Sequence, residues 1–386
     1  MSPPGRPKGE YRSAQHEGTP VSTLLRVAVV GLGVGKSHLQ AYAEIPDLFE
    51  VKAVCELNPD KLRATAAEFG VAWHTTSLPE LLASPEIDLI DLCTPPNTHR
   101  GLIEQVLAAD KHVVCEKPLV GSLAEADAVA AAQRAAKGTL FPIFQYRFGN
   151  GLQRLKHLQA KGFARHALIT TMETHWRRDS DYYEIQWRGK WATEMGGVCL
   201  TQACHAHDIL SYVHGPVKTV FAKLATRVND IEGEDCAAIT VELANGSLAV
   251  LSATLGAAEE TSRLRFVFGD MTVESDSPEP YRPGKEPWHF KGKTPQIDAA
   301  ITAALADFEP TLESFAGQLA RIHACITQGA PTPVTLADAR ASLELITAIY
   351  YSAESGTPQS LPIAPEHPRY ASWVPAAHGF AKALAS

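Results

Sequence analysis

The sequence lacks several features that would place it in common classes of protein. It has no C-x-x-C pair among its 7 cysteines, no polybasic run, and no apolar segment as long as a membrane span. Its formal charge of -8 is spread over 386 residues, so neither a nucleic acid nor an anionic membrane is an expected partner. An odd number of cysteines without a disulfide spacing is typical of a reduced, cytoplasmic protein.

The ends of the chain differ in composition from its middle. Residues 1–24 are polar and rich in proline, glycine and charge, which predicts a disordered leader. The first apolar stretch, 24–34, is interrupted by Arg26 and by glycines, so we interpret it as a first strand and not as a signal peptide. Residues 365–386 are expected to form a C-terminal tail. The length of the chain favours two domains.

A glycine-rich turn between residues 25 and 56 organises the first domain. The apolar run 26–30 ends at this turn, and a helical stretch and a second apolar run, 51–55, follow it. In this order, glycines let the backbone approach a pyrophosphate, and the N-terminus of the helix favours the phosphate charge. The expected phosphate-binding residues are Gly31, Gly33, Val34, Gly35 and Lys36.

Glu56 ends the second apolar run, about 20 residues after the turn, where a carboxylate accepts hydrogen bonds from adenosine ribose hydroxyls. A 2′-phosphate would meet its negative charge, so the sequence predicts NAD in preference to NADP. The glycine spacing is G-x-G-x-G and not G-x-G-x-x-G, and Lys36 takes the place of the third glycine. From there it could reach a phosphate. The alternative is a purely structural turn, which does not explain the acid.

Strands alternate with helices up to about residue 147, which predicts a parallel sheet with its ligands at the carboxyl ends of the strands. Ser77 and Glu80 have the spacing of a capping box, and Asn97 is a good N-cap for the next helix. Polar clusters at 94–99 and 116–118 follow two of the strands. They supply further candidates for cofactor binding, namely Thr94, Pro95, Asn97, His99, Glu116 and Lys117.

The pattern changes after about residue 148. Consecutive strands separated by short turns, such as 244–246, predict an antiparallel sheet. We therefore expect a parallel α/β domain at 25–147 and an α+β domain at 148–364. A loop at 277–296 and helices at 309–328 and 337–354 are expected near its end.

Lys117 lies between Glu116 and Pro118 at the carboxyl end of a strand. Close to a cationic nicotinamide, such a lysine can take or hold a substrate proton. The alternative is a solvated loop lysine paired with Glu116, and only its position over the expected cofactor argues against this. The proline after it favours a cis peptide bond.

His205 lies on an expected helix at 199–213, where Thr201, His205 and Asp208 have the i, i+4, i+7 spacing of one face. A histidine presented in this way can shuttle a proton near neutral pH. A hydrogen-bonded core histidine is the alternative. No metal site is predicted, because the neighbouring candidates point to different faces of the helix and lack a standard ligand spacing. These candidates are Cys199, Cys204, His205 and His207.

The segment 176–191 is rich in tryptophan and tyrosine and also contains arginines and an aspartate. Flat apolar rings beside hydrogen-bonding groups suit a sugar, and Trp187 is the candidate for stacking on it. Packing between domains or subunits explains the same composition equally well.

Together these motifs resemble the glucose–fructose oxidoreductase / inositol 2-dehydrogenase / MocA family over residues 25–362. The resemblance implies a Rossmann domain followed by a domain with a large open, mainly antiparallel sheet that often builds homodimers or homotetramers. It also implies NAD-dependent hydride transfer at a carbinol carbon of a sugar, glycoside or cyclic polyol. The motifs that carry it are VVGLGVGKSH, CTPPNTH, CEKP, QYRF and GGVCLTQACHAHD.

The resemblance also assigns roles to residues. Lys117 matches the lysine of the family's EKP motif and His205 matches its helix histidine, so both are expected to be catalytic. Thr201 stands where many members carry an aspartate that orients this histidine. The expected substrate-binding residues are Gln145, Tyr146, Arg147, Trp187, Thr201 and His205.

Two functions from other classes compete with a dehydrogenase. An NAD-dependent glycosidase oxidises a ring hydroxyl transiently, so no NADH accumulates. A non-catalytic NAD-binding regulator would need neither Lys117 nor His205, and the presence of both argues against it. Fold alone decides none of these.

Overall fold

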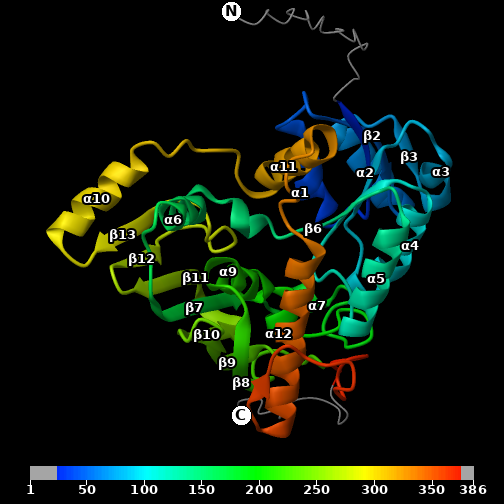
Figure 1. Ribbon diagram of the computed structural model, residues 1–386. Coiled ribbons are helices and arrows are strands. Elements are labelled where there is room, and N and C mark those ends of the chain that lie inside the picture. The colour runs from blue at the N-terminus through cyan, green and yellow to red at the C-terminus, as the bar shows by residue number, and fades with distance from the viewer. Residues whose placement is uncertain (1–23, 375–386) are drawn as a thin grey trace, which may run out of the picture.

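The computed structural model describes residues 24–374, which form two β-sheets with helices around them (Figure 1). Nearly all of the expected leader at 1–24 and most of the expected tail at 365–386 lie outside the described residues. Within the described part, no helix is long and apolar enough to cross a membrane.

The first sheet has six parallel strands in the order β3-β2-β1-β4-β5-β6, which confirms the predicted Rossmann arrangement. Its strands are apolar because helices cover both faces; in β1, for example, residues 27–30 are buried. The strands are β1 Leu25–Val30, β2 Phe49–Cys55, β3 Trp73–Thr75, β4 Leu89–Leu92, β5 His112–Cys115 and β6 Leu140–Pro142. The helices are α1 Gly35–Ala43, α2 Pro59–Phe69, α3 Leu78–Ala83, η1 Pro96–Thr98, α4 His99–Ala108, α5 Leu123–Ala135 and η2 Gln145–Phe148.

The second sheet has eight strands in the order β13-β12-β11-β7-β10-β9-β8-β14. All neighbours are antiparallel except β7 and β10, so the sheet is mainly antiparallel, as predicted. The strands are β7 Ala167–Arg177, β8 Val217–Ala225, β9 Cys236–Leu243, β10 Leu248–Thr254, β11 Gly256–Phe268, β12 Met271–Ser275, β13 Trp288–Gly292 and β14 Gln359–Ser360. The helices are α6 Asn150–Ala160, α7 Ser180–Tyr183, α8 Val198–Thr201, α9 Cys204–His214, α10 Pro295–Leu305, α11 Ser314–Gln328 and α12 Leu336–Ser355.

Helix α11 comes late in the chain but packs against α1 of the first domain (Figure 1). Its buried Leu319 belongs to the same apolar cluster as Leu39 of α1. Gln318 of α11 accepts a hydrogen bond from the Phe144 N–H at 3.1 Å and donates one to the Pro142 carbonyl at 2.7 Å. The boundary expected at residue 147 therefore separates the sheets but not the helices that cover them.

Two expected helix caps are wrong. The Ser77 side chain makes no capping hydrogen bond, and Glu80 accepts a 2.7 Å bond from the Thr75 hydroxyl. Asn97 lies inside η1, so that Thr98 precedes α4 and caps it without a side-chain hydrogen bond. At Ser77, the neighbouring Thr75 hydroxyl takes the Glu80 carboxylate that a capping box would need. At Asn97, a short 3-10 turn moves the start of α4 to a later residue.

The end of the second domain also differs from the prediction. The expected loop at 277–296 contains strand β13, and helix α10 follows it where no helix was expected. The helix expected from residue 309 begins at Ser314. Proline and lysine on both sides of β13 hid a short strand that pairs on only one side, with β12.

The described part of the expected tail packs against the body of the protein. The Trp373 side chain is 1% exposed, and its indole N–H donates a 2.7 Å hydrogen bond to the Met195 carbonyl. Tyr370 is buried and hydrogen-bonds to Asp127 of α5 and Arg340 of α12. Residues 365–374 therefore link the two domains.

Candidate active site

The glycine turn after β1 has a closed inner side and an open outer side. Gly31 has a φ of 88°, and a Cβ there would lie 2.5 Å from the Cys93 carbonyl oxygen, so only glycine fits. A Cβ at Gly33 would meet no atom within 4 Å. Helix α1 begins at Gly35, after Val34, which caps it without a side-chain bond. The Ser37 N–H donates to the Val34 carbonyl at 2.8 Å, whereas the Lys36 N–H has only a long 3.4 Å contact with the Gly33 carbonyl. The N–H groups from Gly33 to Lys36 are therefore the ones that a pyrophosphate can bind.

Glu56 lies beside this turn. Its carboxylate accepts hydrogen bonds from the main-chain N–H groups of Leu32 and Asn58, at 3.1 and 3.2 Å, and pairs with Lys61 at 2.8 Å. Partial burial opposes ionisation, but Lys61 and the two N–H groups lower the pKa of Glu56 below its usual value. An ionised acid next to the phosphate-binding turn is what the adenosine ribose requires. These features fit NAD.

Lys36 lies on the first turn of α1 but its ammonium pairs with Glu68 of α2 at 2.7 Å. Both side chains are well exposed, so this pair contributes little stability and can open. A contact between Lys36 and phosphate stays a prediction.

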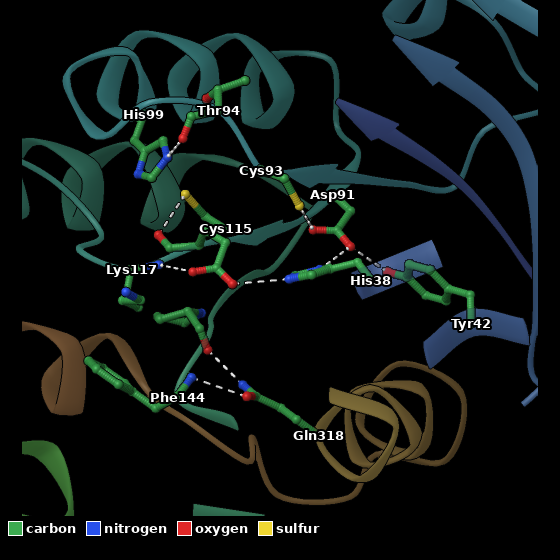
Figure 2. A network of polar contacts seen from close by, with 12 residues as sticks. His38, Tyr42, Asp91, Cys93, Thr94, His99, Cys115, Lys117, Phe144 and Gln318 are labelled. Carbon is green, nitrogen blue, oxygen red and sulfur yellow. Dashed lines mark hydrogen bonds and ion pairs between the residues drawn. The ribbon is translucent and has the colours of Figure 1, made fainter. Parts of the chain in front are cut away.

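His99 joins the two polar loops that follow β4 and β5 (Figure 2). Its ring lies between the carbonyl oxygens of Pro118 and Thr94, each 2.9 Å from one ring nitrogen. The ring is fully buried, so it supports the loops from inside and cannot itself reach a cofactor. Asn97 is exposed and the Thr94 hydroxyl bonds to Thr98 at 2.8 Å, so both lie at the surface of the first loop.

Lys117 connects the two domains. Its ammonium donates a 2.6 Å hydrogen bond to the Thr201 carbonyl, and its main-chain N–H donates to the Glu116 carboxylate at 3.0 Å. The bond between Lys117 and Pro118 is cis, as expected. The alternative, a surface pair of the lysine with Glu116, does not form through the ammonium, because Glu116 is buried and bonds to His38.

His205 lies next to this lysine with its ring 3% exposed. It stacks on Tyr146 with ring centroids 4.0 Å apart. It also makes an edge-to-face contact with Phe144, whose ring centroid lies 6.2 Å from its own. Burial and the positive charge of Lys117 lower the pKa of His205 well below its usual value. The ring is therefore neutral at pH 7, and its buried Nδ1 has no hydrogen-bond partner among the described residues.

The helix expected at 199–213 is broken, so the proposed common face of Thr201 and His205 is wrong. Thr201 ends α8, and its hydroxyl donates a 2.8 Å hydrogen bond to the Gly197 carbonyl. At the break, the Ala203 N–H donates a 2.8 Å hydrogen bond to the Val198 carbonyl five residues back, so this turn is wider than an α-helical turn. Thr201 therefore reaches the site through its carbonyl group, and not through its side chain.

Arg147 was expected to bind substrate, but its guanidinium is buried and engaged. It forms a two-pronged ion pair with Asp208, at 2.7 and 2.5 Å, and also contacts Asp338 at 3.3 Å. Burial opposes the charge, but Asp208 raises the pKa of Arg147 above its usual value. Asp208 is consequently turned away from His205. These ion pairs hold η2 to α9 and α12, and they occupy the guanidinium that was expected to bind substrate.

Gln145 and Trp187 remain candidates for contact with substrate. Gln145 is 8% exposed, and its buried Oε1 has no hydrogen-bond partner among the described residues. The half-buried Trp187 ring lies 4.4 Å from the guanidinium carbon of Arg188, which also covers the ring of Tyr182 at 3.9 Å. The expected aromatic and cationic surface is therefore present in the structure.

Comparison with known proteins agrees with this geometry. The family "Oxidoreductase family, NAD-binding Rossmann fold" matches residues 25–144, and "GFO/IDH/MocA C-terminal domain" matches residues 153–292. The chain belongs to the GFO/IDH/MocA family. It is an NAD-binding dehydrogenase of this family, as the sequence motifs implied.

Individual relatives of this GFO/IDH/MocA protein are distant. A myo-inositol 2-dehydrogenase of Thermotoga maritima is 29% identical over 235 residues, which are 59% of this chain and 67% of that protein. A D-apiose dehydrogenase of Paraburkholderia graminis is 25% identical over 347 residues, 85% of this chain and 88% of the relative. The uncharacterized oxidoreductase YrbE of Bacillus subtilis is 30% identical, but the match spans only 65% of its length.

Solved structures share the whole fold of this GFO/IDH/MocA chain. The WlbA dehydrogenase from Bordetella pertussis, in complex with NADH and UDP-GlcNAcA, has a TM-score of 0.77 and 27% identity. The alignment covers 88% of this chain and 99% of that structure. A levoglucosan dehydrogenase with NADH and levoglucosan has a TM-score of 0.74 at 20% identity, with coverage of 88% and 100%.

The sequence did not predict a group of buried polar residues that lies close to Lys117. His38, Tyr42 and Asp91 form a buried hydrogen-bonded group that reaches Glu116 (Figure 2). Two signals were available, because His38 ends the VVGLGVGKSH motif and Asp91 is a charge inside an otherwise apolar strand.

No metal site follows from the described residues. The ligand-type atoms of one trio, His38, Asp91 and Cys93, lie within 4.8 Å of one another. All three side chains hydrogen-bond within the protein, and burial raises the pKa of the Cys93 thiol. A protonated thiol is a poor ligand, so this trio is a hydrogen-bonded cluster. The cysteines and histidines of 199–207 form no such group.

Proposed function

We propose that this protein transfers hydride between NAD and a carbinol carbon of a sugar, glycoside or cyclic polyol. In this proposal Lys117 and His205 exchange the proton of the reacting hydroxyl. The hydrogen bond from the Lys117 ammonium to the Thr201 carbonyl carries the proposal, because it holds the lysine of one domain beside the histidine of the other.

The residues of the first domain would hold the cofactor. Main-chain N–H groups from Gly33 to Lys36 would bind the pyrophosphate, and Glu56 would bind the adenosine ribose. Thr94 and Pro95 lie at the carboxyl end of β4, beside the Lys117 loop, and would line the nicotinamide. When bound, NAD supplies the hydride acceptor.

The proton would move between the substrate hydroxyl and the two side chains. A neutral His205 has one ring nitrogen free to accept a proton, and its charge would then be opposed by the nearby lysine. Lys117 can donate to the same hydroxyl oxygen, which favours its alkoxide form and hence release of hydride. The two residues thus provide complementary donor and acceptor groups at one place.

Unpaired buried polar atoms support a substrate with many hydroxyls. Gln145 Oε1 and His205 Nδ1 are both buried and have no partner among the described residues. A buried polar atom without a partner costs about 1–3 kcal/mol, which a hydroxyl of the ligand would offset. Trp187 would stack on the C–H face of the ring. A sugar or polyol offers both kinds of contact.

The proposal is tested by the appearance of NADH with a panel of polyols, sugars and glycosides, read by nicotinamide absorbance. We expect net NADH from at least one polyol or sugar, and NADH formation at least about 100-fold slower with Lys117→Ala under the same conditions. Cleavage of a glycoside without net NADH would favour a glycosidase. Tight NAD binding without turnover of any compound would favour a regulator.

We also propose that the open face of the second sheet pairs with another copy of the chain. This face carries apolar side chains that are 41–53% exposed, an arrangement that soluble monomers rarely keep. Light scattering should therefore give a homodimer or homotetramer, and Leu248→Lys with Val250→Lys should give a smaller species. The side chains are those of Leu168, Ile169, Leu248 and Val250.

The state of the cysteines supports a cytoplasmic location. All seven cysteines are free, and five of them are buried, where a disulfide could not form without refolding. We place the protein in the reducing cytoplasm. Targeting of a fluorescent fusion tests this, and an exported fusion would contradict it.

A further inference from the structure

A line of buried polar groups runs from the cofactor helix to the catalytic lysine (Figure 2). On α1, the Tyr42 hydroxyl donates to Asp91 at 3.0 Å, and His38 Nδ1 lies 2.8 Å from the same carboxylate oxygen. His38 Nε2 lies 3.0 Å from Glu116 Oε1. The other oxygen of Glu116 accepts the main-chain N–H of Lys117 at 3.0 Å.

The contacts of His38 define its charge. Each ring nitrogen faces a carboxylate oxygen, and only the imidazolium can donate from both nitrogens. Asp91 and Cys93 face the ring from the end of β4 and Glu116 from the end of β5, while the Phe315 ring of α11 lies 4.3 Å away. Burial opposes protonation, but Asp91 and its neighbours raise the pKa of His38 well above its usual value.

Glu116 is the middle group of the line. It is buried, which opposes ionisation, but the bond and charge of His38 and then the charge of Lys117 lower its pKa to about 2. The carboxylate is therefore ionised at every pH at which the enzyme would work. The line has alternating charges, negative on Asp91 and Glu116 and positive on His38 and Lys117.

This line is not a route for protons to solvent. Its far end is Tyr42, which is 1% exposed, and both His38 and Asp91 are fully buried. A proton that entered at Lys117 would have no exit there. The line must therefore act through fixed charge and geometry.

We propose that His38 is a positioning residue for Lys117: its imidazolium keeps Glu116 ionised and oriented, and Glu116 in turn holds the main chain of Lys117 and places a fixed negative charge beside Lys117 and His205. This rests on the proposed role of Lys117 in proton transfer. His38 lies three residues after Gly35, where α1 begins at the pyrophosphate site. One rigid helix thus joins cofactor binding to the acid–base site.

The test compares two nearly isosteric changes that remove opposite charges. His38→Gln keeps a donor for Glu116 but removes the positive charge, so the proton affinity of His205 rises. The acidic limb of the pH profile of kcat/KM for oxidation should therefore move by about one pH unit to higher pH. Glu116→Gln removes the negative charge and should move the limb in the opposite direction. The double variant should return it close to the wild-type position.

The controls separate electrostatics from general loosening. His323→Gln changes a second buried histidine, one that packs on Phe49 and does not contact Glu116. This change should leave the limb in place. Shifts of both variants in one direction, or no shift, would overturn the proposal. Nitrogen NMR of the wild type should show the His38 ring doubly protonated at pH 8, and a neutral ring would equally overturn it.

Failure of this inference can be told from failure of the proposed function. If Lys117→Ala keeps full turnover, the role of the lysine itself is wrong. If Lys117→Ala is inactive while His38→Gln has the wild-type profile and turnover, only the role of His38 is wrong. Should His38→Gln not fold, Glu116→Gln breaks the same line, and its unchanged profile would count against the proposal in the same way.

Discussion

The ammonium of Lys117 donates a 2.6 Å hydrogen bond to the carbonyl oxygen of Thr201, a residue 84 positions later in the chain. The donor follows a strand of the Rossmann sheet, and the acceptor ends a short helix of the second domain. Because the bond uses the main chain of Thr201, the position depends on the fold of that segment and not on the threonine side chain. Variants at Lys117 and at other positions of the site test what each residue contributes.

Lys117→Ala should lower turnover by about 100- to 10,000-fold, the usual range for a lost acid–base group. NAD affinity, measured by calorimetry, should change by less than about threefold because the phosphate and ribose contacts lie elsewhere. Thr201→Ala is the matched control and should keep most of the turnover, since its carbonyl is unchanged. A larger loss for Thr201→Ala than for Lys117→Ala would contradict the geometry.

His205 should show no titration at its ordinary pKa of about 6.5. Its pKa is lowered in the folded protein, so below about pH 6.5 the unfolded chain binds a proton that the folded chain does not, and stability falls as the pH drops. His205→Gln should make this loss less steep in denaturant titrations. The same variant should lose about 100-fold or more in kcat. A pH–stability curve identical to the wild type would show that the ring is not held neutral.

Glu56→Ser should reduce the preference for NAD over NADP by about tenfold, because the repulsion between the carboxylate and a 2′-phosphate disappears. Fluorescence titration with both reduced cofactors measures this ratio. Glu50→Ser changes an exposed acid at the other end of β2 and should leave the ratio unchanged. Tighter binding of NADP than of NAD by the wild type would refute the role of Glu56.

Gly33→Val and Gly31→Ala should have different effects. A side chain at Gly33 meets no protein atom, so the thermal midpoint should hold within a few degrees while NAD affinity is lost. A methyl group at Gly31 would collide with the Cys93 carbonyl at a φ that disfavours alanine, so this variant should unfold at lower temperature. Unchanged NAD affinity in Gly33→Val would mean that the pyrophosphate lies elsewhere.

Arg147→Met should lower the free energy of unfolding by about 3–5 kcal/mol, because Asp208 would be left buried without its partner. Arg177→Met removes an exposed pair with Asp179 and should cost less than about 1 kcal/mol. Urea unfolding measures both. If Arg147→Met raised KM and left stability intact, the arginine would be a substrate contact after all.

The sequence by itself determined the local units and their order. The glycine turn at residues 31–35 directly follows the apolar run 26–30, and Glu56 comes at the end of the next apolar run. Alternation of strands and helices, and later of short strands and turns, predicted both sheets. Lys117 and His205 were also found in this way, because each stands in a motif set by chain-local spacing.

Tertiary structure decided every feature that depends on partners far apart in the chain. Arg147 is held by Asp208, 61 residues later in the chain. Thr201 and His205 share no helix face, because the chain leaves the α-helical pattern between α8 and α9. His38 meets Asp91 and Glu116 across 53 and 78 residues. Burial opposes a positive charge on both His38 and His205, but only His38 has a carboxylate at each ring nitrogen to overcome it. Only the folded chain brings those carboxylates to the ring.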